Sequence, residues 1–235
     1  MYRDGAAVIM VLITFFVISF ITNVLGPIFP ALIAHFHIGL GVAGFFPFAF
    51  FVAYGLMSIP AGLLVESWGE KKVMLLAFLA SAIGAALFAA VPQLEMALSS
   101  LFLIGAGMAF LQVAINPLLR VAGGEQHFAF YSVLAQFCFG AAATLSPLIY
   151  SYLSTDGLVI TQSLGASTSW LAMYWIFALI SVVMLLYIAL LKKRKVERND
   201  DEKVGSWQTH RELFRNHIVR RYFAAIVCYV ATEQG

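Results

Sequence analysis

The chain has 235 residues, of which 62% are hydrophobic and 11% are charged, and its formal net charge is +2. Soluble proteins carry about 25% charged residues, and a mean hydropathy of +0.90 implies more apolar surface than a soluble domain of this length can bury. The composition therefore excludes a soluble enzyme, a disordered chain and a disulfide scaffold. It predicts an integral membrane protein.

Six apolar runs without Asp, Glu, Lys or Arg follow one another along the chain. They cover about 6–34, 42–65, 73–91, 96–119, 128–153 and 169–191. Each is long enough to cross the hydrocarbon core as a helix, which takes about 20 residues, and none alternates as barrel strands do. A seventh run starts near Arg221 and reaches Gly235, too short to cross, so we expect a helix cut off part-way. The predicted fold class is an all-α membrane protein with six transmembrane helices and a truncated seventh.

The Lys and Arg residues are confined to alternate loops. All 14 lie in the N-terminal segment, between the second and third runs, between the fourth and fifth, or after the sixth. The other loops carry only His35, His37, Glu95 and Asp156 as ionisable residues. Loops rich in Lys and Arg stay in the cytoplasm, so the N-terminus and the segment after the sixth run are predicted to be cytoplasmic. Two histidines are too few for a metal site, and we expect them to be interfacial residues.

Proline and glycine recur at related places in the first and second sets of three runs. The first run ends with Asn23, Gly26 and Pro27, and the fourth ends with Asn116 and Pro117, whereas the third and sixth lack proline. Three-helix repeats of opposite topology are how many secondary transporters are built, and the pattern predicts two inverted repeats. The alternative is that Pro and Gly are simply frequent in membrane helices.

The loop between the second and third runs carries the strongest motif. Its residues are Gly62, Glu66, Gly69, Lys71 and Lys72. Glu66 at the end of a helix needs a cation or a facing helix N-terminus as a partner, and Gly69 permits a tight turn. The pattern resembles the loop signature of the major facilitator superfamily, with Ser67 and Glu70 in place of two of its usual basic residues. We expect the motif to act in conformational gating.

Further segments resemble the fucose permease group of sugar–proton symporters within that superfamily. They are 21–30 (ITNVLGPIFP), 54–62 (YGLMSIPAG), 112–117 (QVAINP) and 229–235 (YVATEQG). The resemblance implies 12 spans in two six-helix halves. The chain would then comprise an amino-terminal bundle at 1–191, a basic cytoplasmic linker at 192–217 and the start of the seventh span at 218–235.

The chain departs from that group where coupling to protons takes place. The group has one acid three residues after the asparagine that matches Asn23, and another four residues before the asparagine that matches Asn116. Here these positions are Gly26 and Gln112, which weakens the case for proton coupling through them. Glu233 is the one acid within an apolar run and is the candidate for coupling.

Four carboxamides within the apolar runs, Asn23, Gln112, Asn116 and Gln136, are the predicted substrate-binding residues. A carboxamide inside a membrane is unfavourable unless it is paired or lines a wet cavity. Each one both donates and accepts hydrogen bonds, which suits a neutral hydroxyl. The alternative for each residue is a hydrogen bond between helices that serves only packing.

Two groups of aromatic residues have expected positions. Trp170, Tyr174 and Trp175, at the outer end of the sixth run, fit an interfacial aromatic belt. Phe46, Phe51 and Tyr54 in the second run have the chemistry to stack on a sugar, but core packing is the favoured interpretation.

These features predict a secondary transporter in the cytoplasmic membrane that moves a small neutral solute, most simply a sugar, by alternating access between two halves. The expected partners are that solute, a coupling proton, membrane lipid and a carboxy-terminal half; no cofactor, metal or nucleic acid is expected. The alternative is a six-span scaffold or subunit that transports nothing. An intramembrane enzyme is disfavoured because no Ser-His-Asp set, metal-bearing acid or phosphate loop lies in the apolar runs.

Overall fold

The computed structural model describes residues 5–155, 169–191 and 215–234. The chain divides into two compact units, Met1–Glu197 and Arg198–Gly235, which are described separately. Within its described residues, the first unit contains six helical segments long and apolar enough to cross a membrane. They are Gly5–Phe36, Leu40–Trp68, Glu70–Ala90, Leu94–Gly123, Phe128–Ser154 and Trp170–Leu190. The prediction of an all-helical protein with six spans is confirmed.

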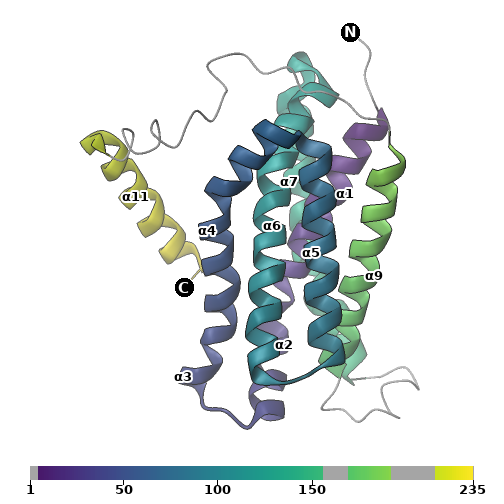
Figure 1. Ribbon diagram of the computed structural model, residues 1–235, viewed down its shortest axis with the longest axis vertical. Helices are drawn as coiled ribbons and strands as arrows, with labels where there is room; N and C mark the ends of the chain where they lie inside the picture. The colour runs from purple at the N-terminus through teal and green to yellow at the C-terminus, as the bar shows by residue number, and fades with distance from the viewer. Residues whose placement is uncertain (1–4, 156–168, 192–214, 235) are drawn as a thin grey trace. The chain divides into compact units, whose positions relative to one another are not determined.

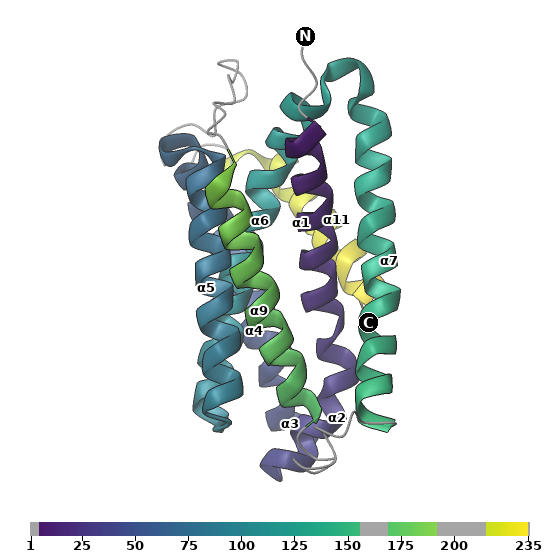
Figure 2. The ribbon, with the colours of Figure 1, turned by 90° about the vertical axis from the view of Figure 1, so that its right-hand side faces the viewer.

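The helices of the first unit run side by side along one axis (Figures 1 and 2). In chain order they are α1 (Gly5–Asn23), α2 (Leu25–Phe36), α3 (Leu40–Ala43), α4 (Phe45–Trp68), α5 (Glu70–Ala90), α6 (Leu94–Gly123), α7 (Phe128–Thr155) and α9 (Ser169–Leu190), with a short 3-10 turn at Glu125–His127. The second unit contains α11 (His217–Gln234), near whose start the Asn216 side-chain oxygen accepts a hydrogen bond from the Ile218 amide at 3.0 Å. Most of the predicted linker, 192–214, lies outside the described residues.

The first span is broken past its middle and the second near its start, which the apolar runs did not predict. α1 ends at Asn23, four residues before Pro27, and α3 ends at Ala43, four residues before Pro47. A proline has no N–H to donate to the carbonyl four residues earlier, so the helical ladder lacks that bond at both places. Broken membrane helices are tolerated where the backbone faces protein or a water-filled cavity.

The packing of the helices reflects the predicted inverted repeat in part. α1 packs against α7, and α4 packs against α6. When the first three spans are matched with the last three, α1 corresponds to α6 and α4 to α7. The contact between α1 and α7 then corresponds to the contact between α6 and α4. The match is incomplete, because α5 packs extensively on α6 whereas α9 barely touches α1.

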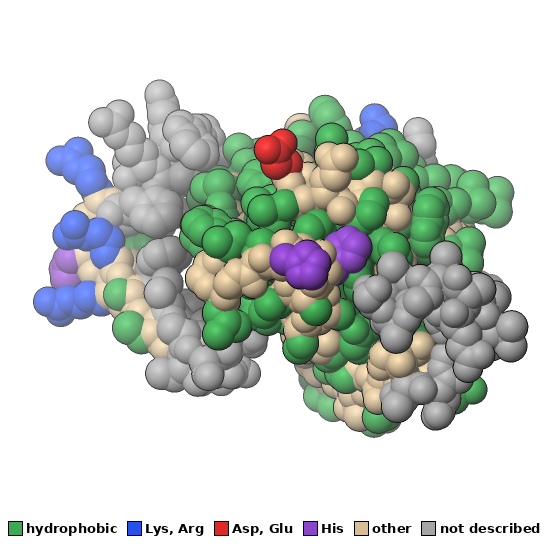
Figure 3. Space-filling model, turned by 90° about the horizontal axis from the view of Figure 1, so that it is seen from below, with side chains coloured by type: hydrophobic (Ala, Val, Ile, Leu, Met, Phe, Trp, Pro, Cys, Tyr) green, Lys and Arg blue, Asp and Glu red, His purple; other side chains and the backbone are tan. Residues whose placement is uncertain are grey.

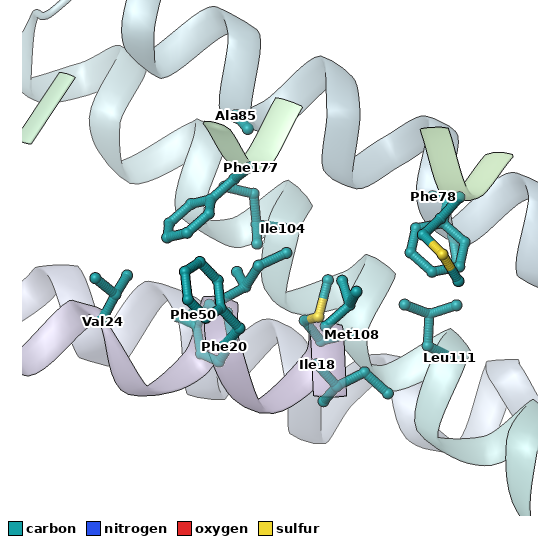
Figure 4. Close-up of a cluster of buried hydrophobic side chains, with 14 of the residues drawn as sticks. Ile18, Phe20, Val24, Phe50, Phe78, Ala85, Ile104, Met108, Leu111 and Phe177 are labelled. Atoms are coloured by element: carbon teal, nitrogen blue, oxygen red, sulfur yellow. The ribbon is translucent and has the colours of Figure 1, made fainter. Parts of the chain in front are cut away.

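α6 lies at the centre of this packing and makes its closest approach to α4 at Gly105. A Cβ atom at Gly105 would collide with the main-chain oxygen of Phe50, so only glycine allows the two backbones to approach this far. Around this contact, side chains from α1, α4, α5, α6 and α9 interdigitate in the apolar core that Figure 4 shows. The core includes Phe20 of α1, Phe78 of α5 and Phe177 of α9.

The prediction of an aromatic belt was wrong for two of its three residues. Trp170 and Tyr174 are 0% and 2% exposed, whereas Trp175 is 53% exposed. The rings of Trp170 and Tyr174 lie 5.1 and 4.3 Å from that of Phe88, measured between ring centroids. Residues four apart share a helix face and the next residue points about 100° away, so one face of α9 packs on α5 while Trp175 points outward.

Polar residues divide between the two ends of the bundle as the loop charges predicted. His35 and His37 lie at the end of the first span and Glu95 at the start of α6. Figure 3 views this end, where the histidines lie among mainly hydrophobic and uncharged side chains. Lys71 and Lys72 lie at the start of α5, which Figure 1 places at the opposite end of the bundle.

Candidate solute-binding face

Asn23 lies at the break between α1 and α2 and is half-buried. Its side-chain nitrogen donates to the main-chain oxygen of Ser19 at 2.9 Å and to the Ser19 hydroxyl at 3.1 Å. The Ser19 hydroxyl in turn donates to the main-chain oxygen of Phe139 on α7 at 2.6 Å. Asn23 is therefore held by its own helix and is linked through Ser19 to α7.

Gln112 and Asn116 lie one turn apart on α6, beyond its tight contact with α4. The side-chain oxygen of Gln112 is buried and has no hydrogen-bond partner in the described part of the chain. Asn116 is exposed, and its side-chain nitrogen donates to the main-chain oxygen of Gln112 at 3.3 Å. Ala109 and Gly105, one and two turns earlier on α6, are buried, so the polar surface on this side of the helix begins at Gln112.

Gln136 lies on α7 and is exposed, as are Gly140 and Thr144 one and two turns further along the helix. The Thr144 hydroxyl donates to the Gly140 main-chain oxygen at 3.1 Å. Among the residues that the structure describes, the Gln136 side chain has no hydrogen-bond partner.

Within the described residues, none of the four carboxamides makes a side-chain hydrogen bond to another helix. Such bonds are made instead by serines, from Ser19 to Phe139 and from Ser146 on α7 to the main-chain oxygen of Phe20 on α1 at 2.7 Å. The packing role that was the alternative for the amides is thus carried by other residues in this bundle.

The exposed surface of the bundle differs between helices. From Trp170 to Leu190 on α9 the exposed side chains are all apolar, among them Leu179 and Leu186. On α6 and α7 the exposed positions include the amides Asn116 and Gln136. Lipid tails suit the first surface, whereas exposed amides at membrane depth need water or protein beside them.

One small apolar cavity lies among α1, α2, α4, α6 and α9, and its volume is about 10 Å³. Its walls are Ile21, Leu25, Phe50, Leu101, Ile104, Tyr174 and Phe177. That space holds about one water molecule, so this cavity is too small for a solute of monosaccharide size.

In the predicted gating motif the turn is made as expected by Gly69, whose φ of +82° is a backbone conformation that favours glycine. Gly62 is buried in α4, and Glu66 and Lys72 are exposed. Sequence reasoning missed the role of Lys71, whose ammonium group donates to the main-chain oxygen of Ala189 at 2.9 Å and to that of Leu191. Lys71 therefore caps the last turn of α9, where the helix dipole favours a cation.

The two positions in the bundle that were considered for proton coupling, Gly26 and Gln112, carry no ionisable side chain. Gly26 is exposed in α2, with open space where a side chain would lie. Glu233 falls within α11, but its side chain lies outside the described part of the chain.

The sequence model that describes the family named Major Facilitator Superfamily matches residues 11–234 of this chain. The chain belongs to this superfamily. It is 29% identical over 240 residues to a glucose/galactose transporter of Brucella abortus, covering 97% of this chain and 56% of that protein. It is 27% identical over 214 residues to the L-fucose-proton symporter of Escherichia coli, covering 81% of this chain and 48% of that protein.

Solved structures agree with this assignment. The chain resembles the E. coli fucose:proton symporter FucP with a TM-score of 0.63 and 25% identity, covering 90% of this chain and 57% of that one. It resembles FucP in the outward conformation with a TM-score of 0.65 and 26% identity, covering 86% of this chain and 53% of that one. The chain thus spans about half the length of the curated relatives it matches, and it shares their fold over that half.

Proposed function

We propose that this chain forms one six-helix half of a secondary transporter for a neutral monosaccharide of the glucose, galactose or fucose type. The observation that carries the proposal is the group of carboxamides on α1, α6 and α7 that make no hydrogen bonds between helices within the described residues. The names of the transporters it resembles supply the substrate class. Solute would bind between this face and a second half, which is either continuous with the chain or supplied separately.

In this proposal Asn23, Gln112, Asn116 and Gln136 contact sugar hydroxyls. The unpartnered oxygen of Gln112 supports the assignment, because a buried acceptor without a donor costs about 1–3 kcal/mol, and a hydroxyl that reached it would remove that cost. A six-span scaffold, the alternative, offers no comparable reason for leaving the buried oxygen of Gln112 without a partner in the described part of the chain.

The placement in the membrane is also a proposal. The multi-pass bundle would lie in the cytoplasmic membrane with its N-terminus and the Lys71 end of the bundle facing the cytoplasm, as the distribution of Lys and Arg favours. The motif from Gly62 to Lys72 would then lie at the inner surface and act in conformational cycling, with α9 and α5 in contact with lipid.

Proton coupling, where it occurs, would use a site other than the Gly26 and Gln112 positions, because neither side chain exchanges a proton in the physiological range. Glu233 remains the candidate. This proposal places the sugar site and the proton site on different residues. It differs from an arrangement in which acids at the Gly26 position of α2 and the Gln112 position of α6 carry the proton.

Uptake by the complete transporter, reconstituted in liposomes, tests the function. We expect saturable counterflow of radiolabelled glucose, galactose or fucose, inhibited by an excess of the same unlabelled sugar. An uncoupler applied during net uptake reports whether a proton gradient drives accumulation. Absence of counterflow for all three sugars from correctly folded protein would contradict the proposed substrate class.

A further inference from the structure

Ser19 occupies an unusual position between a predicted solute contact and a neighbouring helix. It is fully buried on α1, one turn before Asn23. Its hydroxyl has a single proton, which is donated to the main-chain oxygen of Phe139 on α7 at 2.6 Å. The hydroxyl oxygen of Ser19 can therefore act only as an acceptor toward Asn23.

This arrangement determines which way the Asn23 carboxamide is turned. Its nitrogen lies 2.9 Å from the Ser19 main-chain oxygen and 3.1 Å from the Ser19 hydroxyl oxygen. Both partners are acceptors, so the reversed amide would place its oxygen against two other oxygens. The amide nitrogen is engaged by these two acceptors within the helix, and the group that Asn23 turns away from Ser19, toward a solute, is its carbonyl oxygen.

We propose that Ser19 is a positioning residue that makes Asn23 an acceptor-only contact, so that the solute must present a hydroxyl donor there. The inference rests on the proposed function, in which Asn23 contacts the sugar, and it adds a specificity rule to it. Gln112 contrasts with Asn23, because no side-chain hydrogen bond fixes it within the described residues and it can offer either of its polar atoms.

Ser146 provides a matched control. It is also fully buried, and its hydroxyl donates across the same pair of helices, to the main-chain oxygen of Phe20 at 2.7 Å. No side-chain amide donates to it among the described hydrogen bonds. Ser146→Ala therefore removes the same kind of bond between α1 and α7 without releasing Asn23.

The experiment compares sugar analogues bound to the complete transporter. For each hydroxyl of glucose or galactose, the equilibrium affinity is measured for the parent sugar, the deoxy analogue and the deoxyfluoro analogue. Fluorine accepts a hydrogen bond weakly and cannot donate one. At the hydroxyl that meets Asn23 we expect both analogues to bind about two- to tenfold more weakly than the sugar, with no advantage for fluorine.

Ser19→Ala removes the hydroxyl acceptor of Asn23 and keeps the main-chain acceptor at residue 19. The hold on the amide nitrogen is then reduced, and an N–H of Asn23 can turn toward the solute. At that same hydroxyl position the deoxyfluoro analogue should then gain about twofold or more on the deoxy analogue. Ser146→Ala should keep the parental order of analogues, and Ser19→Thr, which retains a hydroxyl, should restore it. If Ser19→Ala does not fold, Ser19→Cys gives the same comparison, because a thiol is only a weak donor and acceptor.

Failure of this inference is distinguishable from failure of the proposed function. If Asn23→Ala binds the sugar and every analogue as the parent does, Asn23 is not a solute contact and the proposed site is wrong. If Asn23→Ala abolishes discrimination at one hydroxyl while Ser19→Ala retains the parental order of analogues there, the site stands and the role of Ser19 is overturned.

Discussion

Gln112 combines a half-buried side chain with a buried carboxamide oxygen that lacks a partner in the described part of the chain. Buried polar atoms are almost always hydrogen-bonded, and each exception asks for an explanation. The main-chain oxygen of Gln112 already accepts from Asn116, so this region of α6 has one satisfied and one unsatisfied acceptor. A solute hydroxyl is the donor that the proposed function supplies.

We expect Gln112→Ala to weaken sugar binding to the complete transporter by roughly 2- to 150-fold. The lower value corresponds to one lost hydrogen bond and the upper to a partner left unpaired, at about 1.4 kcal/mol per tenfold. Equilibrium binding of radiolabelled sugar measures this. Gln93→Ala is the matched control, since Gln93 is an exposed carboxamide in the turn before α6 and should leave affinity unchanged. Parental affinity in Gln112→Ala would assign the residue to packing.

At this scale the sequence identified which residue types to examine but not their partners. Asn and Gln within apolar runs are visible in any sequence, because they are costly at membrane depth. The bonds from Ser19 to Phe139 and from Lys71 to Ala189 join residues more than 100 positions apart. They depend on how helices are placed in space, which no local spacing reveals.

The helices themselves were largely predictable, because a run of uncharged residues long enough to span the membrane has few alternatives to a helix. The breaks after Asn23 and Ala43 were not predicted, although the prolines that follow them were visible. Proline alone does not decide the matter, since Pro60, Pro117 and Pro147 lie inside unbroken helices.

Lys71 joins two of these elements, the start of α5 and the end of α9. We expect Lys71→Met to destabilise the bundle by about 0.3–2 kcal/mol, the range for a cation at a helix C-terminus, and to slow transport because the loop motif loses its attachment to α9. Thermal unfolding in detergent micelles and initial rates of uptake measure the two effects.

Lys72→Met tests whether the loss of stability in Lys71→Met comes from the lost cap on α9 or from the lost positive charge of the loop. Lys72 is adjacent in sequence and exposed, and an exposed substitution away from such contacts usually changes stability by less than about 0.5 kcal/mol. Equal destabilisation by both variants would mean that the charge of the loop, and not the cap on α9, is what matters.

The six-span unit has its own apolar core, and its exposed surface is apolar on one helix and partly polar on two others. α1, α4, α5, α6 and α9 enclose the apolar core, and the small cavity among them is too small for a sugar. The exposed face of α9 is apolar, whereas α6 and α7 expose amides. A bundle with such a core is expected to fold in a membrane, and its exposed amides on α6 and α7 are left for the second half that the proposal places opposite them.

We therefore expect residues 1–235 alone to insert and fold but not to transport. Liposomes that contain only this polypeptide should show no saturable counterflow of glucose, galactose or fucose, because the polar face has no opposing wall and alternating access needs two halves that rock around the solute. Co-reconstitution with a second six-helix half of the same transporter should restore counterflow. Cooperative thermal unfolding of the polypeptide is the necessary control, since it separates a folded but incomplete site from a misfolded chain. Saturable counterflow from residues 1–235 alone would mean that two copies of this face, or one copy by itself, form the path, and the proposal of a half-transporter would then be wrong.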